Sequence, residues 1–145
     1  MPIDTLIAHV YYRDLEEAVA WLTRVFGFVE QFRYGSPIGG AQLRAANAWV
    51  MLKGLPAEGR TPRELGYDTQ SLTIFVEEVE AHCERARYGG AAIVEEPHET
   101  VYGEFQYAAR DLDGHHWIFS RHARDLSPTD WRATVAQHNP HVIER

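Results

Sequence analysis

Four polar side chains on predicted strands have the residue types needed to move a proton or to orient a bound molecule. His9 lies in an apolar strand, and Glu104, Gln106 and His116 lie on a hairpin in the second half of the chain. Alternate residues of a strand point to opposite faces, which places these side chains on the face opposite the apolar residues. Glu104 and His9 are the candidate catalytic acid or base, because carboxylate and imidazole groups exchange protons in enzymes.

Aromatic and other large side chains share these faces. Trp49 and Tyr11 offer flat rings that could stack on a planar or cationic molecule, and Phe75 adds apolar area. The same rings could instead fill the interior, and Glu104 could lie in water at a cavity mouth. The candidate ligand-binding residues are Tyr11, Trp49, Met51, Phe75, Gln106 and His116.

The elements that carry these residues occur twice in the same order. In the first half, Asp14 is suited to cap a helix that Gly27 ends, and acidic residues occupy its first turn. In the second half, Gly89 stops a helix on whose solvent face we expect His82. The first half predicts a strand at 6–12, a helix at 15–26 and strands at 28–34, 41–46 and 49–53. The second predicts a strand at 71–76, a helix at 79–88, a strand at 91–95, a loop at 97–101 and a hairpin at 104–110 and 115–121.

This internal repeat predicts a single domain over residues 1–121. The two modules span about 3–53 and 69–121, and a linker at 54–68 joins them. Residues 122–145 form an extension, in which Ser127 and Pro128 predict the start of a short helix ending near residue 137. Trp131 on this helix is expected to pack back onto the domain.

Composition narrows the class of protein. A chain of 145 residues with 45% hydrophobic and 24% charged residues is typical of a globular domain. A net charge of −7 disfavours nucleic-acid binding and suits a cationic ligand. The single Cys83 suits a reducing compartment. With neither a signal peptide nor a membrane-length apolar run in the sequence, we expect a cytoplasmic protein without membrane partners.

Three local motifs give the chain a family resemblance. They are the turn Asp111-Leu112-Asp113-Gly114-His115, the Gly27-Phe28 pair and the segment Trp49-Val50-Met51-Leu52. Together they resemble the vicinal-oxygen-chelate superfamily, which includes glyoxalase I, bleomycin-resistance proteins and extradiol dioxygenases. The resemblance implies an α+β fold in which two βαβββ modules form a curled, half-open mixed sheet around a cavity. It also implies a homodimer, because many members dimerise.

The resemblance also permits a test for the family's divalent metal. Aligned with its metal-dependent members, the ligand positions fall at Ile7, Met51, Ser71 and Ile118. Two aliphatic groups, a thioether and a hydroxyl are a poor set for a hard divalent cation, so we expect neither a metal nor another cofactor. A two-residue shift would bring in His9, which with His116 and Glu104 would make an unusual metal site.

Three functions remain open, and one of them is a structural or regulatory module whose cavity is incidental. The first is a bleomycin-resistance-like protein that sequesters a small planar or cationic molecule in an aromatic cavity without a metal. The alternative is a glyoxalase-like lyase, isomerase or dioxygenase that acts on a small oxygenated substrate with one divalent metal ion.

Overall fold

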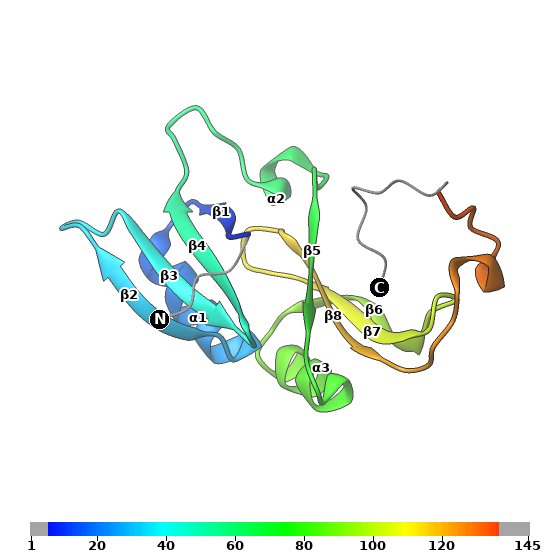
Figure 1. Ribbon diagram of the computed structural model, residues 1–145. Coiled ribbons are helices and arrows are strands. Elements are labelled where there is room, and N and C mark those ends of the chain that lie inside the picture. The colour runs from blue at the N-terminus through cyan, green and yellow to red at the C-terminus, as the bar shows by residue number, and fades with distance from the viewer. Residues whose placement is uncertain (1–5, 137–145) are drawn as a thin grey trace.

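The computed structural model describes residues 6–136, and the expectations for residues 3–5 and 137 lie outside this range. Two modules of the same architecture lie side by side (Figure 1). The first contains β1 (Ala8–Tyr12), α1 (Leu15–Phe26), β2 (Val29–Tyr34), β3 (Gly40–Ala45) and β4 (Ala48–Gly54). The second contains β5 (Ser71–Phe75), α3 (Val79–Tyr88), β6 (Ala92–Glu99), β7 (Glu104–Arg110) and β8 (His116–His122).

Each module has one mixed four-stranded sheet with the same topology. The strand order is β1-β4-β3-β2 in the first sheet and β5-β8-β7-β6 in the second. In each sheet the first strand runs parallel to the last, and the remaining neighbours are antiparallel. The predicted α+β class and the repeated order of strand, helix and three strands are confirmed.

Helix α1 begins and ends where its sequence signals predicted. The Asp14 side chain accepts a hydrogen bond of 3.1 Å from the Glu17 backbone N–H, which satisfies a free donor at the helix start. Gly27 follows the helix in the left-handed conformation, with φ 73°. The apolar stripe of the helix is buried against its sheet, which turns the opposite face of the sheet outward.

One hydrophobic core spans both modules. Phe26, at the end of α1, packs edge-to-face on Phe119 of β8, with 4.8 Å between ring centroids. Phe28 contacts Trp117 in the same way at 5.3 Å. Helices α1 and α3 also contact each other. The helix-covered faces of the two sheets are therefore stabilised by a shared set of apolar side chains.

His82 of α3 is half-buried against this shared core, so the expectation that it faces solvent was wrong. The centroid of its ring lies 4.1 Å from the centroid of the Phe119 ring, and its Nε2 lies 2.9 Å from the Phe26 carbonyl oxygen. Nδ1 lies 2.5 Å from the Tyr107 hydroxyl. Burial lowers the pKa of His82 to about 4. The neutral ring thus links the two modules.

Two further expectations need correction. The strand predicted to start at residue 6 begins at Ala8, and Leu6 is 75% exposed ahead of the sheet. The expected loop at 97–101 starts too early, since β6 extends through Pro97 to Glu99. Proline is tolerated there because β6 is an edge strand with a register shift near this position.

The linker contains a short helix that the sequence analysis missed, α2 (Pro62–Leu65). Thr61 and Glu64 form a capping box, in which each side chain accepts from the other residue's backbone N–H. Threonine, then proline, then glutamate at the third helical position is the usual signature of a helix start.

The C-terminal helix is shorter than predicted. It is a single 3-10 turn, η1 (Pro128–Trp131), and residues 133–136 are not helical. The centroids of the Trp131 and Tyr102 rings lie 5.9 Å apart, as expected of a residue that packs back onto the domain. Within residues 6–136, none of the helices has the length and apolar character required to span a membrane.

Candidate functional site

The first open surface is the face of β1 that points away from α1. His9 and Tyr11 lie on it, both exposed, while Val10 and Tyr12 are buried beneath the helix. Beside this face is a hollow of about 500 Å³. Its other walls come from the linker and from the β7–β8 turn, and include Leu55, Pro56, Arg60, Leu65, Gln70 and His115.

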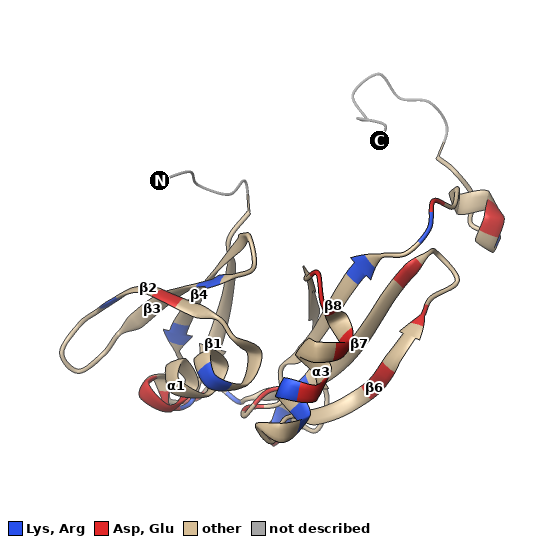
Figure 2. Ribbon diagram, turned by 90° about the horizontal axis from the view of Figure 1, so that it is seen from below, with Lys and Arg blue, Asp and Glu red and all other residues tan. Residues whose placement is uncertain are grey.

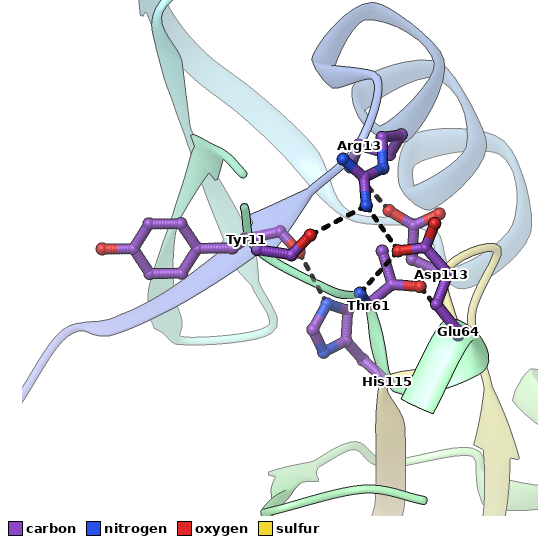
Figure 3. Close-up of polar contacts among 7 residues, drawn as sticks. Tyr11, Arg13, Thr61, Glu64, Asp113 and His115 are labelled. Carbon is purple, nitrogen blue, oxygen red and sulfur yellow. Dashed lines mark hydrogen bonds and ion pairs between the residues drawn. The ribbon is translucent and has the colours of Figure 1, made fainter. Parts of the chain in front are cut away.

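Side-chain contacts hold the linker against β1 (Figure 3). Arg13 binds Glu64 at 2.5 Å, and Glu64 in turn accepts from the backbone of Thr61. On the other side, His115 Nε2 lies 2.8 Å from the Tyr11 carbonyl oxygen. The wall of the hollow is thus fixed to the strand that carries His9 and Tyr11.

Trp49 and Met51 extend this face onto β4, where both are half-buried. Met51 lies opposite His9 on one side and opposite Gln42 of β3 on the other. Gln42 is only 4% exposed, yet within the described residues its Nε2 has no hydrogen-bond partner. An unpaired buried donor is costly, so this amide is available to a ligand.

The second open surface is the corresponding face of β5, β7 and β8. Gln106 lies near its centre and is 6% exposed. Its Oε1 accepts from Ser120 Oγ and from the Tyr102 hydroxyl, each at 3.4 Å. These contacts fix the orientation of the amide. Phe75 on the edge strand β5 is 58% exposed and, with Arg44 and Arg121, lines a hollow of about 800 Å³.

Glu104 and His116 lie at opposite ends of this second face. Glu104 is opposite His122 in the ladder, whereas His116 is opposite Arg110. The six residue steps from position 116 to position 122 correspond to about 20 Å of strand. Glu104 and His116 of one chain therefore cannot bind the same metal ion, whose ligands each lie about 2 Å from it. The unusual site with His9, His116 and Glu104 is excluded in that form.

Glu104 nevertheless has an available acceptor atom. In residues 6–136 its buried Oε2 has no hydrogen-bond partner, and His122 Nδ1 is 4.0 Å away. The His122 ring is bound to Asp125 through Nε2 at 2.7 Å. The Glu104 carboxylate can therefore accept a donor from a bound molecule.

His116 is held by two residues that the sequence analysis did not single out, Asp68 and Arg110. His116 Nδ1 lies 3.2 Å from Asp68 Oδ2, and Arg110 Nη1 donates to Asp68 Oδ1. The hydrogen bond from Arg110 holds the pKa of Asp68 below its ordinary value. Strand alternation through Glu104, Gln106 and Ala108 could have placed Arg110 on this face, but no local pattern marks Asp68.

The ladders give a direct test of the family's metal site. Metal-dependent members would need imidazole and carboxylate donors where the first and last strands of each module face each other. The central pairs are His9 with Met51 and Thr73 with Ile118. Their neighbours are Tyr11 with Lys53 and Ser71 with His116. Each pair offers at most one imidazole and no carboxylate, so the residues present do not fit a divalent metal.

Over residues 6–136, no three His, Cys, Asp or Glu side chains gather closely enough to hold an ion. Acidic residues occur on α1, α3, β6 and β7, and α1, α3 and β7 also carry basic residues (Figure 2). A further hollow of about 530 Å³, near Trp21 and Tyr67, contains none of the predicted site residues.

Residues 5–119 match the Glyoxalase/Bleomycin resistance protein/Dioxygenase superfamily. The chain belongs to this superfamily. Membership in the superfamily confirms the resemblance drawn from the hairpin turn and the two shorter motifs, and the repeated module agrees with it.

Solved structures of the superfamily fold extend the comparison. TioX from Micromonospora sp. ML1 is 31% identical, with a TM-score of 0.69 over 82% of this chain and 98% of TioX. The fosfomycin resistance protein FosX from Listeria monocytogenes is 16% identical, with a TM-score of 0.62 over 83% and 94% of the two chains. At that identity FosX shares the fold alone. An uncharacterised Mycobacterium bovis protein, Mb0911c, is 27% identical over 139 residues, which cover 90% of this chain and 91% of its own.

Proposed function

We propose that this protein binds a small planar or cationic organic molecule on its open aromatic sheet faces, without a metal ion. The observation that carries the proposal is the composition of these faces. They present exposed aromatic rings and unpaired polar atoms, while the ladder positions where the family binds its metal lack a suitable ligand set. Drug binding of the bleomycin-resistance kind needs stacking area and a few fixed polar groups, and these are the groups available.

Each predicted residue has a role in this proposal. Tyr11, Trp49 and Phe75 supply ring faces, and Met51 adds an adaptable apolar contact. Glu104 supplies a negative charge suited to a cationic group, and Gln106 is held in place by Ser120. His9 and His116 are the remaining side chains proposed to orient the bound molecule.

A homodimer is part of the same proposal. In one chain Tyr11 is 40% exposed and Phe75 is 58% exposed, so both rings remain open to a partner or a ligand. A second copy that covered these faces would enclose the bound molecule between two sheets. Sedimentation of the purified protein at micromolar concentration should give twice the monomer mass, and a monomer at that concentration would count against this arrangement.

The binding test uses the intrinsic tryptophan fluorescence of the chain, to which Trp49 contributes together with Trp21, Trp117 and Trp131. Titration with planar cationic dyes such as acridine orange and ethidium should quench tryptophan emission with saturation. The Phe75→Ala variant should bind more weakly, whereas Tyr88→Ala, at a position 97% exposed on α3, is the matched control and should bind as the native chain does. Flat titrations across cationic and neutral planar compounds would overturn the proposal.

Elemental analysis separates this proposal from the enzyme alternative. We expect less than stoichiometric zinc, nickel, manganese or iron in protein purified without chelator. One divalent ion per chain would instead favour a glyoxalase-like lyase, isomerase or dioxygenase, and would contradict the metal-independent proposal.

A further inference from the structure

His116 is the first residue of β8, and its side chain is 20% exposed. Its two ring nitrogens have different neighbours. Nδ1 faces Asp68, the linker residue three positions before β5. Nε2 is buried and has no hydrogen-bond partner among the residues the structure describes. The two nitrogens of this ring therefore differ: one is occupied by a carboxylate and one is available.

The Asp68 carboxylate is itself fixed. Arg110 Nη1 donates both to Asp68 Oδ1 and to the Gly114 carbonyl oxygen, the latter at 3.1 Å. Arg110 therefore connects Asp68 to the turn that follows its own strand. Since Arg110 lowers the pKa of Asp68, the carboxylate stays ionised at neutral pH and can only accept hydrogen bonds.

An ionised carboxylate at Nδ1 determines where the proton of a neutral imidazole resides. Asp68 accepts, so Nδ1 carries the hydrogen and Nε2 carries the lone pair. Ser71 lies directly opposite His116 across the parallel ladder, and Arg110 lies opposite it on the other side. His116 therefore lies on the same face of the second sheet as these two neighbours, the face proposed to bind a ligand, and its Nε2 is buried among the side chains of that face.

We propose that His116 Nε2 is a preset hydrogen-bond acceptor that selects planar guests carrying an N–H or O–H donor. Asp68 and Arg110 are positioning residues, since they act through the ring and not on the guest. This inference rests on the proposed function and adds the chemical class of the ligand. Glu104 Oε2 is likewise buried on this sheet face without a hydrogen-bond partner among the described residues, and it is also an acceptor. Both atoms, Glu104 Oε2 and His116 Nε2, would therefore bind a hydrogen-bond donor of the ligand.

The first experiment needs no ligand. Long-range ¹H–¹⁵N NMR of the native chain at pH 8, where imidazole is ordinarily neutral, reports which ring nitrogen carries the proton. We expect His116 in the Nδ1–H form, and a mixture of forms in Asp68→Asn because an amide can also donate. Asp125→Asn, which alters the surface partner of His122, is the matched control and should leave His116 unchanged. An Nε2–H form in the native chain would overturn the proposal.

The second experiment uses a matched pair of probes, indole and 1-methylindole, which differ in a single donor. Titrations followed by NMR should give about tenfold tighter binding of indole to the native chain, as expected for one hydrogen bond. The preference should shrink in Asp68→Asn and in His116→Phe. Equal affinities would overturn the acceptor role while leaving binding on the aromatic faces intact. Binding of neither probe would count against the proposed function itself, and the tautomer measurement would still decide whether the acceptor exists.

Discussion

The hydroxyl of Tyr12 on β1 donates a hydrogen bond of 2.6 Å to Asp111 Oδ2 in the β7–β8 turn, 99 positions away in sequence. Trp117 Nε1 donates to the same oxygen at 2.9 Å, and backbone N–H groups of Asp113 and His115 donate to the other. Burial and the neighbouring carboxylate raise the pKa of Tyr12 well above its ordinary value, so the phenol remains a donor. The family turn motif therefore also fastens one module to the other.

Tyr12→Phe should destabilise the fold by about 1–3 kcal/mol, because it leaves a buried carboxylate oxygen short of one donor. The change is measured as a lower urea midpoint with an unchanged m-value. Tyr88→Phe serves as control, since Tyr88 is 97% exposed, and should unfold with the native midpoint. Equal midpoints for all three chains would show that the contact between Tyr12 and Asp111 contributes nothing.

His82 should make the fold sensitive to acid. Its pKa of about 4 lies below the ordinary 6.5, so between these values the unfolded chain binds a proton that the folded chain does not. Stability from this residue is present above pH 6.5 and is lost as the pH falls toward 4, by about 2–3 kcal/mol. Urea unfolding of the native chain and of His82→Gln across this range should show a smaller loss in the variant. His98→Gln, which alters an exposed histidine on β6, should follow the native profile.

Gly114→Ala should cost more stability than Gly66→Ala, although both glycines have similar left-handed φ values, 90° and 84°. A Cβ at Gly114 would meet the Arg63 backbone nitrogen at 2.7 Å, whereas nothing lies within 4 Å of one at Gly66. The conformational cost of about 1–2 kcal/mol applies to both, and the clash is added only at Gly114. Thermal unfolding measures the difference, and equal melting temperatures would contradict the tight docking of the turn on α2.

Phe75→Ala should leave stability within about 0.5 kcal/mol of the native value, because the ring is 58% exposed. Phe119→Ala removes a fully buried ring and should cost about 3–5 kcal/mol. Chemical unfolding of the two variants at low protein concentration compares a surface ring with a core ring. A large loss in Phe75→Ala would mean that this ring stabilises the folded chain instead of serving a ligand.

The sequence predicted the element order because its signals are local. The Asp14 cap, the apolar stripe of α1 and strict alternation in β1 each involve residues a few positions apart. Alternation also predicted which side chains point away from the helices, including Tyr11 and Phe75. Helix α2 was predictable by the same means from Thr61 and Glu64.

The remainder depends on contacts between distant segments. The burial of His82 follows from the approach of Phe26, which belongs to the other module. The partnership of Asp68 with His116 joins a linker residue to a strand 48 positions later. Nothing near Asp68 in the sequence distinguishes it from a solvated linker aspartate, so only the folded chain reveals what it orients.

Because the two modules are fastened through Phe26, His82 and the Tyr12–Asp111 hydrogen bond, we expect them to stay together when the covalent connection between them is broken. A chain nicked at the exposed Glu58, within the turn before α2, should stay assembled as a complex of two fragments. Either fragment alone would expose half of an interface made for the other. The two modules therefore share an architecture but are complementary parts instead of interchangeable ones.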